Sequence, residues 1–453
     1  MKKHQIFVRD KEFYGNIVKI AVPIVLQSLI TIGVNMMDTM MLGNYGEFQL
    51  SGSSLANEFI AIYQIMCMGL GYGAAVLTSQ FWGNKDIPAL KKVVTIMLRI
   101  GLTVSCLFNL ITFIAPGMIM KIYASDAQII DNGIRYFKIS AFTFIPMGIS
   151  LTLTAILRSV REVKGPLYIS IMAFFVNIFF NWVFIFGNLG APEMQVAGAA
   201  LGTLIARIFE AGATLFIILK LDQKIKYRIK DFFEPCADML KLYLKFCVPV
   251  LISDTLLALG NSAVSIVMGH MGASFVAANA IVSQTTRMST VFTQGVSNSA
   301  SVLTGNTLGT GDKEKTYNQG VTFWALGIII GLLAAVIFLS ISPFIISRFK
   351  ITQETVSVAY ELMYAASLMI VFQSMQSMLT KGILRGGGDT KFLMVGDILF
   401  LWIVSVPLGY VTGLRWHMDA FWVYSALKAD WVIKSLLCTW RLFSRRWMKQ
   451  AKH

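Results

Sequence analysis

The chain has 453 residues, of which 56% are hydrophobic and only 14% are charged, and its formal net charge is +15 at pH 7. So apolar a composition excludes a soluble globular protein. The positive residues are spread over many short polar segments, which predicts contact with the anionic head groups of a lipid bilayer and no nucleic-acid partner.

Apolar stretches of about 20 residues recur along the whole chain, each long enough to cross roughly 30 Å of hydrocarbon as a helix. They lack the alternating polar residues of outer-membrane strands. We therefore predict an all-α polytopic membrane protein with twelve transmembrane helices, at residues 16–42, 53–80, 94–115, 132–157, 165–187, 194–220, 243–269, 276–304, 319–342, 357–380, 392–413 and 419–440.

The first predicted span contains a carboxylate, Asp38, in the stretch "NMMDTMMLG". A charge inside a membrane span costs about 2.5–3.5 kcal/mol, so it indicates a function. Gln27, Thr31, Asn35 and Asp38 are spaced by 4, 4 and 3 and lie along one stripe of the helix. Such a stripe faces protein or water and not lipid. We predict that Asp38 binds a coupling ion, with Asn35 beside it as a substrate contact.

The fifth and sixth spans supply partners for this carboxylate. Asn177 and Asn181 lie one turn apart in "NIFFN", and Ala199 lies near the outer start of the next span. All three are expected at the depth of Asp38. One carboxylate with two amide oxygens and a backbone carbonyl suits a proton or a small cation such as sodium. The alternative is that both asparagines only hydrogen-bond neighbouring helices.

The chain repeats itself after 226 positions. Over residues 21–86 this shift gives 12 identities, among them Pro23 with Pro249 and Asn35 with Asn261. After one residue of slippage, "LR" at 157–158 meets "LR" at 384–385. Since each repeat has an even number of spans, the repeats are parallel. We predict two six-helix lobes, residues 1–221 and 243–453, joined by a cytoplasmic linker at 222–242.

The distribution of Lys and Arg predicts the orientation. The connections on one side of the membrane carry 26 of these residues and those on the other side carry 6. Because positive residues concentrate on the cytoplasmic side, both termini are expected in the cytoplasm and the chain in the cell (inner) membrane.

Other charged residues carry less weight. Asp254 on the seventh span is a candidate ion ligand of the second lobe, and Arg207 with Glu210 predicts an ion pair on one helix. Asp397 and Asp430 lie near span ends, where contact with water suffices to stabilise their charge. Five Cys form no CxxC pair, four His have no metal spacing, and no GxxxxGK[ST] loop is present. We therefore expect no cofactor, no metal beyond a sodium at Asp38, no enzymatic activity, and an ion gradient as the energy source.

Several motifs together resemble the multidrug and toxic compound extrusion family over about residues 14–440. They are a first-helix Pro before "NMMDTMMLG", then "GYGAAVLTSQFWGNKD", "NIFFNWVFIFG", "VAGAALGTLIAR" and "LRGGGDTK". The resemblance implies two lobes in a V shape and export of organic cations against proton or sodium flow, with no obligate protein partner. In the DinF-type branch the ion site matches Asp38, Asn177, Asn181 and Ala199.

The same resemblance implies further site residues. Thr31, Tyr63, Tyr136 and Thr154 would line the first-lobe cavity. Where some members have a second acid, this chain has Asn181, and a single negative charge favours a proton over sodium. The NorM-type branch uses acids on helices 7 and 10; Asp254 lies near the first position, but helix 10 has no acid.

The predicted function is therefore secondary active multidrug export by alternating access. The alternative within the superfamily is a flippase for a lipid-linked precursor, although such proteins tend to have more spans and a more basic cavity. A membrane-embedded enzyme is a third class, which the absence of metal-spaced His and of paired acids within a helix opposes.

Overall fold

The computed structural model describes residues 7–43, 47–348 and 352–451, and no β-strand occurs among them. The α-helices are α1 (Lys11–Gly43), α2 (Glu47–Gly83), α3 (Ile87–Ile114), α4 (Pro116–Tyr123), α5 (Ala127–Ser140), α6 (Phe144–Ser159), α7 (Lys164–Phe186), α8 (Val196–Phe216), α9 (Ile229–Phe233), α10 (Ala237–Gly269), α11 (Ala273–Gly309), α12 (Lys313–Arg348), α13 (Gln353–Ser377), α14 (Thr390–Ile398), α15 (Val406–Tyr410), α16 (Ala420–Leu427) and α17 (Ala429–Phe443). Short 3₁₀ segments lie at Ala141–Thr143 and Asn188–Gly190, and π-helical segments at Ile217–Leu221, Met378–Leu384, Leu399–Ser405 and Val411–Arg415.

All twelve predicted spans fall on helical segments. Within the described ranges, nine helices are long and apolar enough to cross a membrane. The other three predicted spans, 194–220, 276–304 and 419–440, coincide with α8, α11 and the pair α16–α17. The chain is thus an all-α polytopic membrane protein.

The helix boundaries reproduce the sequence repeat. The helices α1 and α10 both have 33 residues and contain the matching prolines Pro23 and Pro249. Both α2 and α11 have 37 residues, and α11 again begins 226 positions after its counterpart. The starts of α3 and α12, of α5 and α13, and of α7 and α14 keep the same interval. The two halves therefore share one fold, in which the glycines and prolines recur.

The repeats differ where their third helices end. The first repeat breaks at Ala115, whose backbone is not helical, and α4 starts at Pro116. In the second repeat α12 continues through Pro343 as one helix of 36 residues. The two prolines at this point, Pro116 and Pro343, are 227 positions apart, which is one more than the interval of 226 between the helix starts.

The chain forms two compact units whose boundaries cross the predicted lobes. One contains Met1–Val25, Ser79–Lys85 and Val248–His453, and the other contains Leu26–Thr78 and Asp86–Cys247. The helices α1 and α2 each contribute to both units, which the sequence repeat did not predict.

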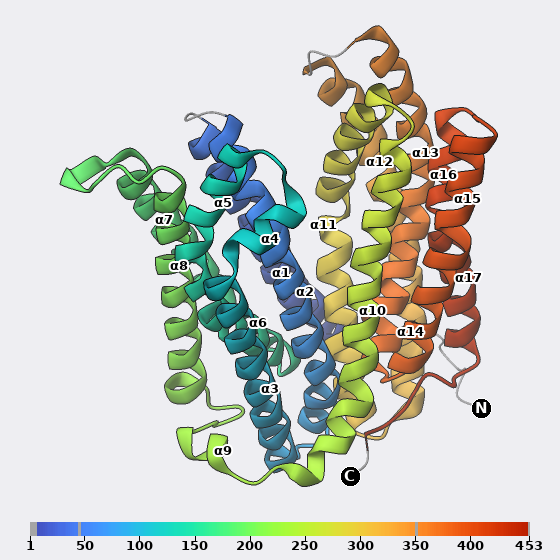
Figure 1. Cartoon of the computed structure of the whole chain (residues 1–453). Helices are drawn as coiled ribbons and strands as arrows, with labels where there is room; N and C mark the ends of the chain where they lie inside the picture. Colours follow the sequence, from blue (N-terminus) through green and yellow to red (C-terminus); the bar gives the residue numbers. More distant parts are fainter. Residues whose placement is uncertain (1–6, 44–46, 349–351, 452–453) are drawn as a thin grey trace. The chain divides into compact units, whose positions relative to one another are not determined.

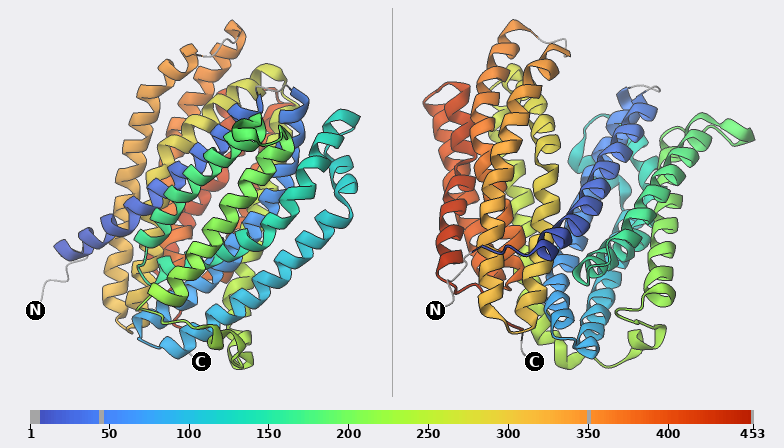
Figure 2. Two further views of the ribbon diagram at one scale, coloured as in Figure 1. Left: turned by 90° about the vertical axis from the view of Figure 1, so that its left-hand side faces the viewer. Right: turned by 180° about the vertical axis from the view of Figure 1, so that it is seen from behind.

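In the unit with Leu26–Thr78, α7 and α8 lie side by side (Figures 1 and 2). Small residues allow this approach, because a side chain at Gly198 would meet the backbone of Phe184 on α7. The core of the unit is aromatic and includes Tyr63, Phe137 and Phe144. In the unit with Val248–His453, α11, α12 and α13 pack on one another, around an aliphatic core that includes Ile370 and Leu427.

Candidate functional site

Three of the predicted ion-site residues contact one another. Asp38 is half-buried on α1, five residues before the end of that helix. The Asn181 side-chain nitrogen donates a hydrogen bond to Asp38 Oδ1 at 2.6 Å and lies 3.2 Å from Asn177 Oδ1. A hydrogen bond to a carboxylate is about twice as strong as one between neutral groups. The geometry thus joins α1 to α7 through Asp38.

The sequence of α8 explains why the side-chain amides of Asn177 and Asn181 on α7 can pack closely against it. Asn177 and Asn181 are 2% and 0% exposed, and Asn177 lies 3.4 Å from the hydroxyl of Thr203 on α8. A Cβ at Gly202 would overlap the amide oxygen of Asn181, so only glycine lets the two helices approach here. Ala199, one turn before Thr203, is buried in the core of the unit. Its role at the ion site stays a prediction.

The amide oxygen of Asn181 is a free acceptor next to Asp38. It is buried, and no hydrogen-bond donor to it exists among the described residues. Leaving such a group unpaired costs about 1–3 kcal/mol. This oxygen faces Gly202 on α8, whereas the amide nitrogen of Asn181 faces Asp38.

Charged groups surround Asp38. Arg207 on α8 and Tyr136 on α5 both interact electrostatically with Asp38. The Arg207 guanidinium donates to Glu210 Oε2 at 2.7 Å, which is the predicted ion pair. Glu210 also interacts with Arg158 on α6, so each acid has a cationic neighbour.

The residues predicted to contact substrate differ in accessibility. Thr31 and Asn35 are exposed on α1, and Thr154 is half-buried on α6. The Tyr136 hydroxyl donates to the amide oxygen of Asn57 at 3.2 Å. Tyr63 is fully buried, and its hydroxyl lies 2.6 Å from both Ser105 Oγ and the carbonyl oxygen of Phe144. Core packing therefore accounts for Tyr63.

Each repeat ties its first helix to the arginine of its "LR" motif. In the first repeat Arg158 hydrogen-bonds the side-chain oxygen of Gln27. In the second, Arg385 forms an ion pair with Asp254 at 2.8 Å and a second contact at 3.4 Å. The predicted second-lobe ion ligand thus already has a cationic partner, since a two-point Arg–carboxylate pair holds both oxygens.

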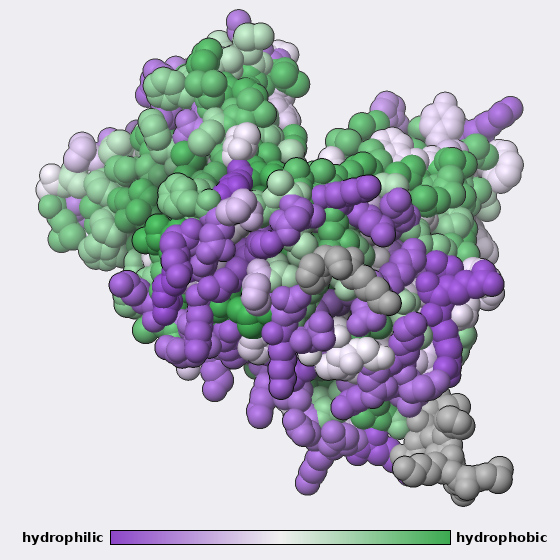
Figure 3. Space-filling view, turned by 90° about the horizontal axis from the view of Figure 1, so that it is seen from below, coloured by the Kyte–Doolittle hydropathy of each residue, from purple (hydrophilic) through white to green (hydrophobic). Residues whose placement is uncertain are grey.

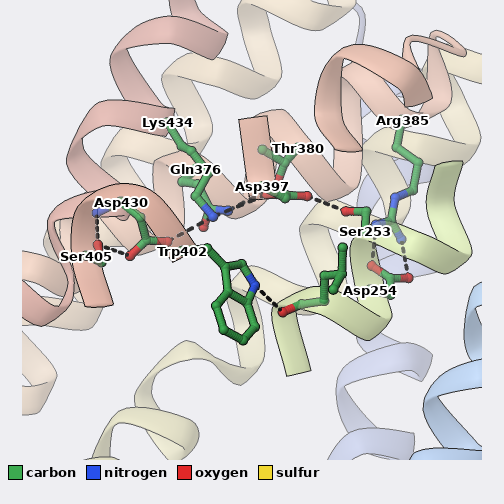
Figure 4. A network of polar contacts seen from close by, with 11 residues as sticks. Ser253, Asp254, Gln376, Thr380, Arg385, Asp397, Trp402, Ser405, Asp430 and Lys434 are labelled. Atoms are coloured by element: carbon green, nitrogen blue, oxygen red, sulfur yellow. Dashed lines mark hydrogen bonds and ion pairs between the residues drawn. The ribbon is translucent and has the colours of Figure 1, made fainter. Parts of the chain in front are cut away.

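A buried charge network beside Asp254 was missed by the sequence reasoning (Figure 4). The Lys434 ammonium on α17 lies 3.2 Å from Asp397 and 2.9 Å from Asp430, and all three residues are at most 4% exposed. Ser253 donates to Asp397 at 2.5 Å, and Ser405 donates to Asp430 at 3.2 Å. The expectation that water stabilises the charges of Asp397 and Asp430 is wrong, because both residues are buried and paired with Lys434. The available signal was the i, i+4 spacing of Asp430 and Lys434.

Comparison with known proteins agrees with this architecture. The sequence profile of the family described as MatE matches residues 23–183 and 249–411, once in each repeat. An uncharacterized transporter, YisQ of Bacillus subtilis (strain 168), is 24% identical over 445 residues, which is 98% of this chain and 96% of the relative. A probable multidrug resistance protein, NorM of Thermotoga maritima, is 22% identical over 440 residues, 97% of this chain and 94% of the relative.

Solved structures share the fold. One described as the outward-facing conformation of a multidrug resistance MATE family transporter of the MOP superfamily superposes with a TM-score of 0.86, at 16% identity, over 98% of this chain and 99% of that one. The crystal structure of MATE in the straight conformation gives the same TM-score, identity and coverage. The chain therefore belongs to the MatE family of membrane transporters.

Proposed function

We propose that this chain is a secondary active multidrug exporter. It would move small organic compounds, often cationic and amphipathic, out of the cell against an inward flow of protons or sodium ions, by alternating access across the cell membrane. The observation that carries the proposal is the contact of Asp38 with Asn181, which also contacts Asn177, inside spanning helices. The second repeat has Val264 at the position of Asp38.

The chemistry of the proposed ion site favours a proton. Sodium needs several oxygen ligands, and of the two asparagine oxygens here only that of Asn181 is free, since that of Asn177 already lies within hydrogen-bond distance of the Asn181 amide nitrogen. A proton needs only one carboxylate oxygen, which Asp38 supplies beside the Asn181 amide. Neither ion requires a cofactor, and the proposal includes no enzymatic step.

The proposed substrate class rests on the surroundings of Asp38 and on the relatives. A carboxylate that binds either a cation or a cationic compound gives antiport directly, because one would displace the other. Several relatives of similar length are described as probable multidrug resistance proteins.

The first prediction tests this proposal. Purified protein in liposomes should export a cationic dye when a proton or a sodium gradient is imposed, each in a separate experiment. Asp38→Asn removes the charge but keeps the shape, so it should abolish gradient-driven export. The matched control is Asp131→Asn, which changes an exposed carboxylate paired with Arg135 on α5 and should export at the normal rate. Normal export by Asp38→Asn under both gradients would refute the assignment.

A further inference from the structure

A stripe of polar residues continues along α8 from the ion site. Ala199, Thr203, Arg207 and Glu210 are spaced by 4, 4 and 3, so they share one face of the helix. Thr203 contacts Asn177, and Arg207 pairs with Glu210. The side chains of Arg207 and Glu210 are 26% and 15% exposed, so they are neither locked in the core nor free in solvent.

The basic residue on this stripe recurs in the second repeat. A shift of 227, the same as for the two "LR" motifs, aligns Val196 with Val423, Ala199 with Ala426 and Arg207 with Lys434. It also aligns Thr203 with Asp430. Both repeats therefore carry a cation at one position of their last helix, although nothing else in the two charge clusters is the same.

The two cations are held differently. Lys434 contacts two carboxylates directly, as Figure 4 shows. Its side chain is 3% exposed. Arg207 contacts one carboxylate, that of Glu210, and interacts at longer range with a second, that of Asp38. The cation of the second repeat is therefore fixed between its acids, whereas that of the first has one bound and one more distant acid.

We propose that Arg207 is an internal counter-ion of the coupling site, which pairs with Glu210 while Asp38 holds the coupling ion and moves toward Asp38 when that ion has left. This inference rests on the proposed function. Arg207 is a positioning residue in this scheme, because it acts on the substrate only through Asp38.

Electrostatics gives the reason for such a counter-ion. Once the coupling ion leaves, the carboxylate of Asp38 is an uncompensated charge in a medium of low dielectric constant, which is costly. A guanidinium on the same helix face can compensate it without a new ion, because arginine keeps its charge and carries five donors on a long side chain. The same movement would favour ion release, since Arg207 and the ion compete for one carboxylate.

The charged and titratable groups around this pair come from four elements. Asp38 on α1 and Tyr136 on α5 face Arg207. Arg158 on α6 interacts with Glu210, so Glu210 keeps a cationic neighbour when Arg207 moves. Glu210 and Arg207 themselves lie on α8. Exchange of Arg207 between two acids therefore leaves neither acid without a cation nearby.

The second prediction uses two substitutions with opposite effects. Arg207→Met removes the counter-ion, so Asp38 should hold a proton more firmly, and the external pH at half-maximal dye export should rise by about one unit, or tenfold in proton concentration. Glu210→Gln releases Arg207 to stay with Asp38, and the same midpoint should fall by about one unit. Under a sodium gradient, the half-saturating sodium concentration should fall in the first variant and rise in the second.

Several controls keep the test decisive. Arg135→Met removes an exposed arginine of α5 from its pair with Asp131 and should leave the midpoint unchanged. Arg207→Lys retains a positive charge and should restore the midpoint to near its normal value. Size-exclusion chromatography and thermal melting show whether a variant folds. For a folded variant that does not export, the midpoint is measured from the pH dependence of equilibrium dye binding instead.

The outcomes separate the two proposals. Opposite shifts support the counter-ion, whereas shifts of the same sign or none overturn it. If Asp38→Asn exports normally, the proposed function itself fails. If Asp38→Asn is inactive while Arg207→Met and Glu210→Gln keep the normal midpoint, only the counter-ion assignment fails.

Discussion

At the scale of the residue, the ion site depends on a position that carries no functional group. Gly202 allows Asn181 to reach Asp38, because a Cβ at residue 202 would overlap the Asn181 amide oxygen. The sequence analysis selected the polar residues of this site from their spacing and left Gly202 unmentioned. Spacing along one helix cannot show which glycine faces a neighbouring helix, because that depends on how the two helices pack.

The third prediction follows from this close approach. In Gly202→Ala, Asn181 must move away from Asp38, and losing a hydrogen bond to a carboxylate costs about 1.5–3 kcal/mol. Because that hydrogen bond favours the charged carboxylate, its loss should lower the proton concentration that gives half-maximal dye export by tenfold or more. Gly212→Ala on the same helix is the matched control, because a Cβ there meets nothing within 4 Å. It should keep normal export and gain about 0.5–1 kcal/mol of helix stability. Equal effects of both substitutions would contradict the role of Gly202.

At the scale of the element, the repeat was the most informative sequence signal. It placed α10 and α11 at a fixed interval after α1 and α2, and the helix boundaries keep that interval. Burial of charge was less predictable. A lysine in an apolar helix can reach a membrane surface or pair inside the fold, and the sequence alone does not distinguish these cases. Lys434 pairs inside the fold because α14 brings Asp397 to it, although the two residues are 37 positions apart in the chain.

The fourth prediction concerns the stability of this element pair. Lys434→Met leaves Asp397 and Asp430 without their shared cation, and breaking a buried ion pair in this way costs about 3–5 kcal/mol. The thermal melting temperature in detergent should therefore fall strongly at neutral pH. The control is Lys428→Met, which removes a half-buried lysine with no direct ion pair among the described residues. A larger loss in the control than in Lys434→Met would contradict this account.

At the scale of the whole molecule, orientation decides which side of the membrane lies nearer to Asp38. Asp38 lies near the end of α1. Figure 3 shows hydrophilic side chains gathered on the face seen from below, where α9 lies in Figure 1. With that face in the cytoplasm, as the positive residues predict, the carboxylate would lie nearer the outside. The direction of transport follows from the ion and substrate gradients, since alternating access exposes the site to both sides.

The fifth prediction tests that orientation. On a background with the five cysteines replaced, Lys230→Cys on α9 and Glu193→Cys between α7 and α8 place single thiols at exposed positions in connections expected on opposite sides. A membrane-impermeant maleimide should label Glu193→Cys in intact cells and Lys230→Cys only after lysis, because positive residues concentrate on the cytoplasmic side. The reverse pattern would put Asp38 near the cytoplasm and contradict the predicted orientation. Labelling after lysis serves as the control for thiol reactivity in both variants.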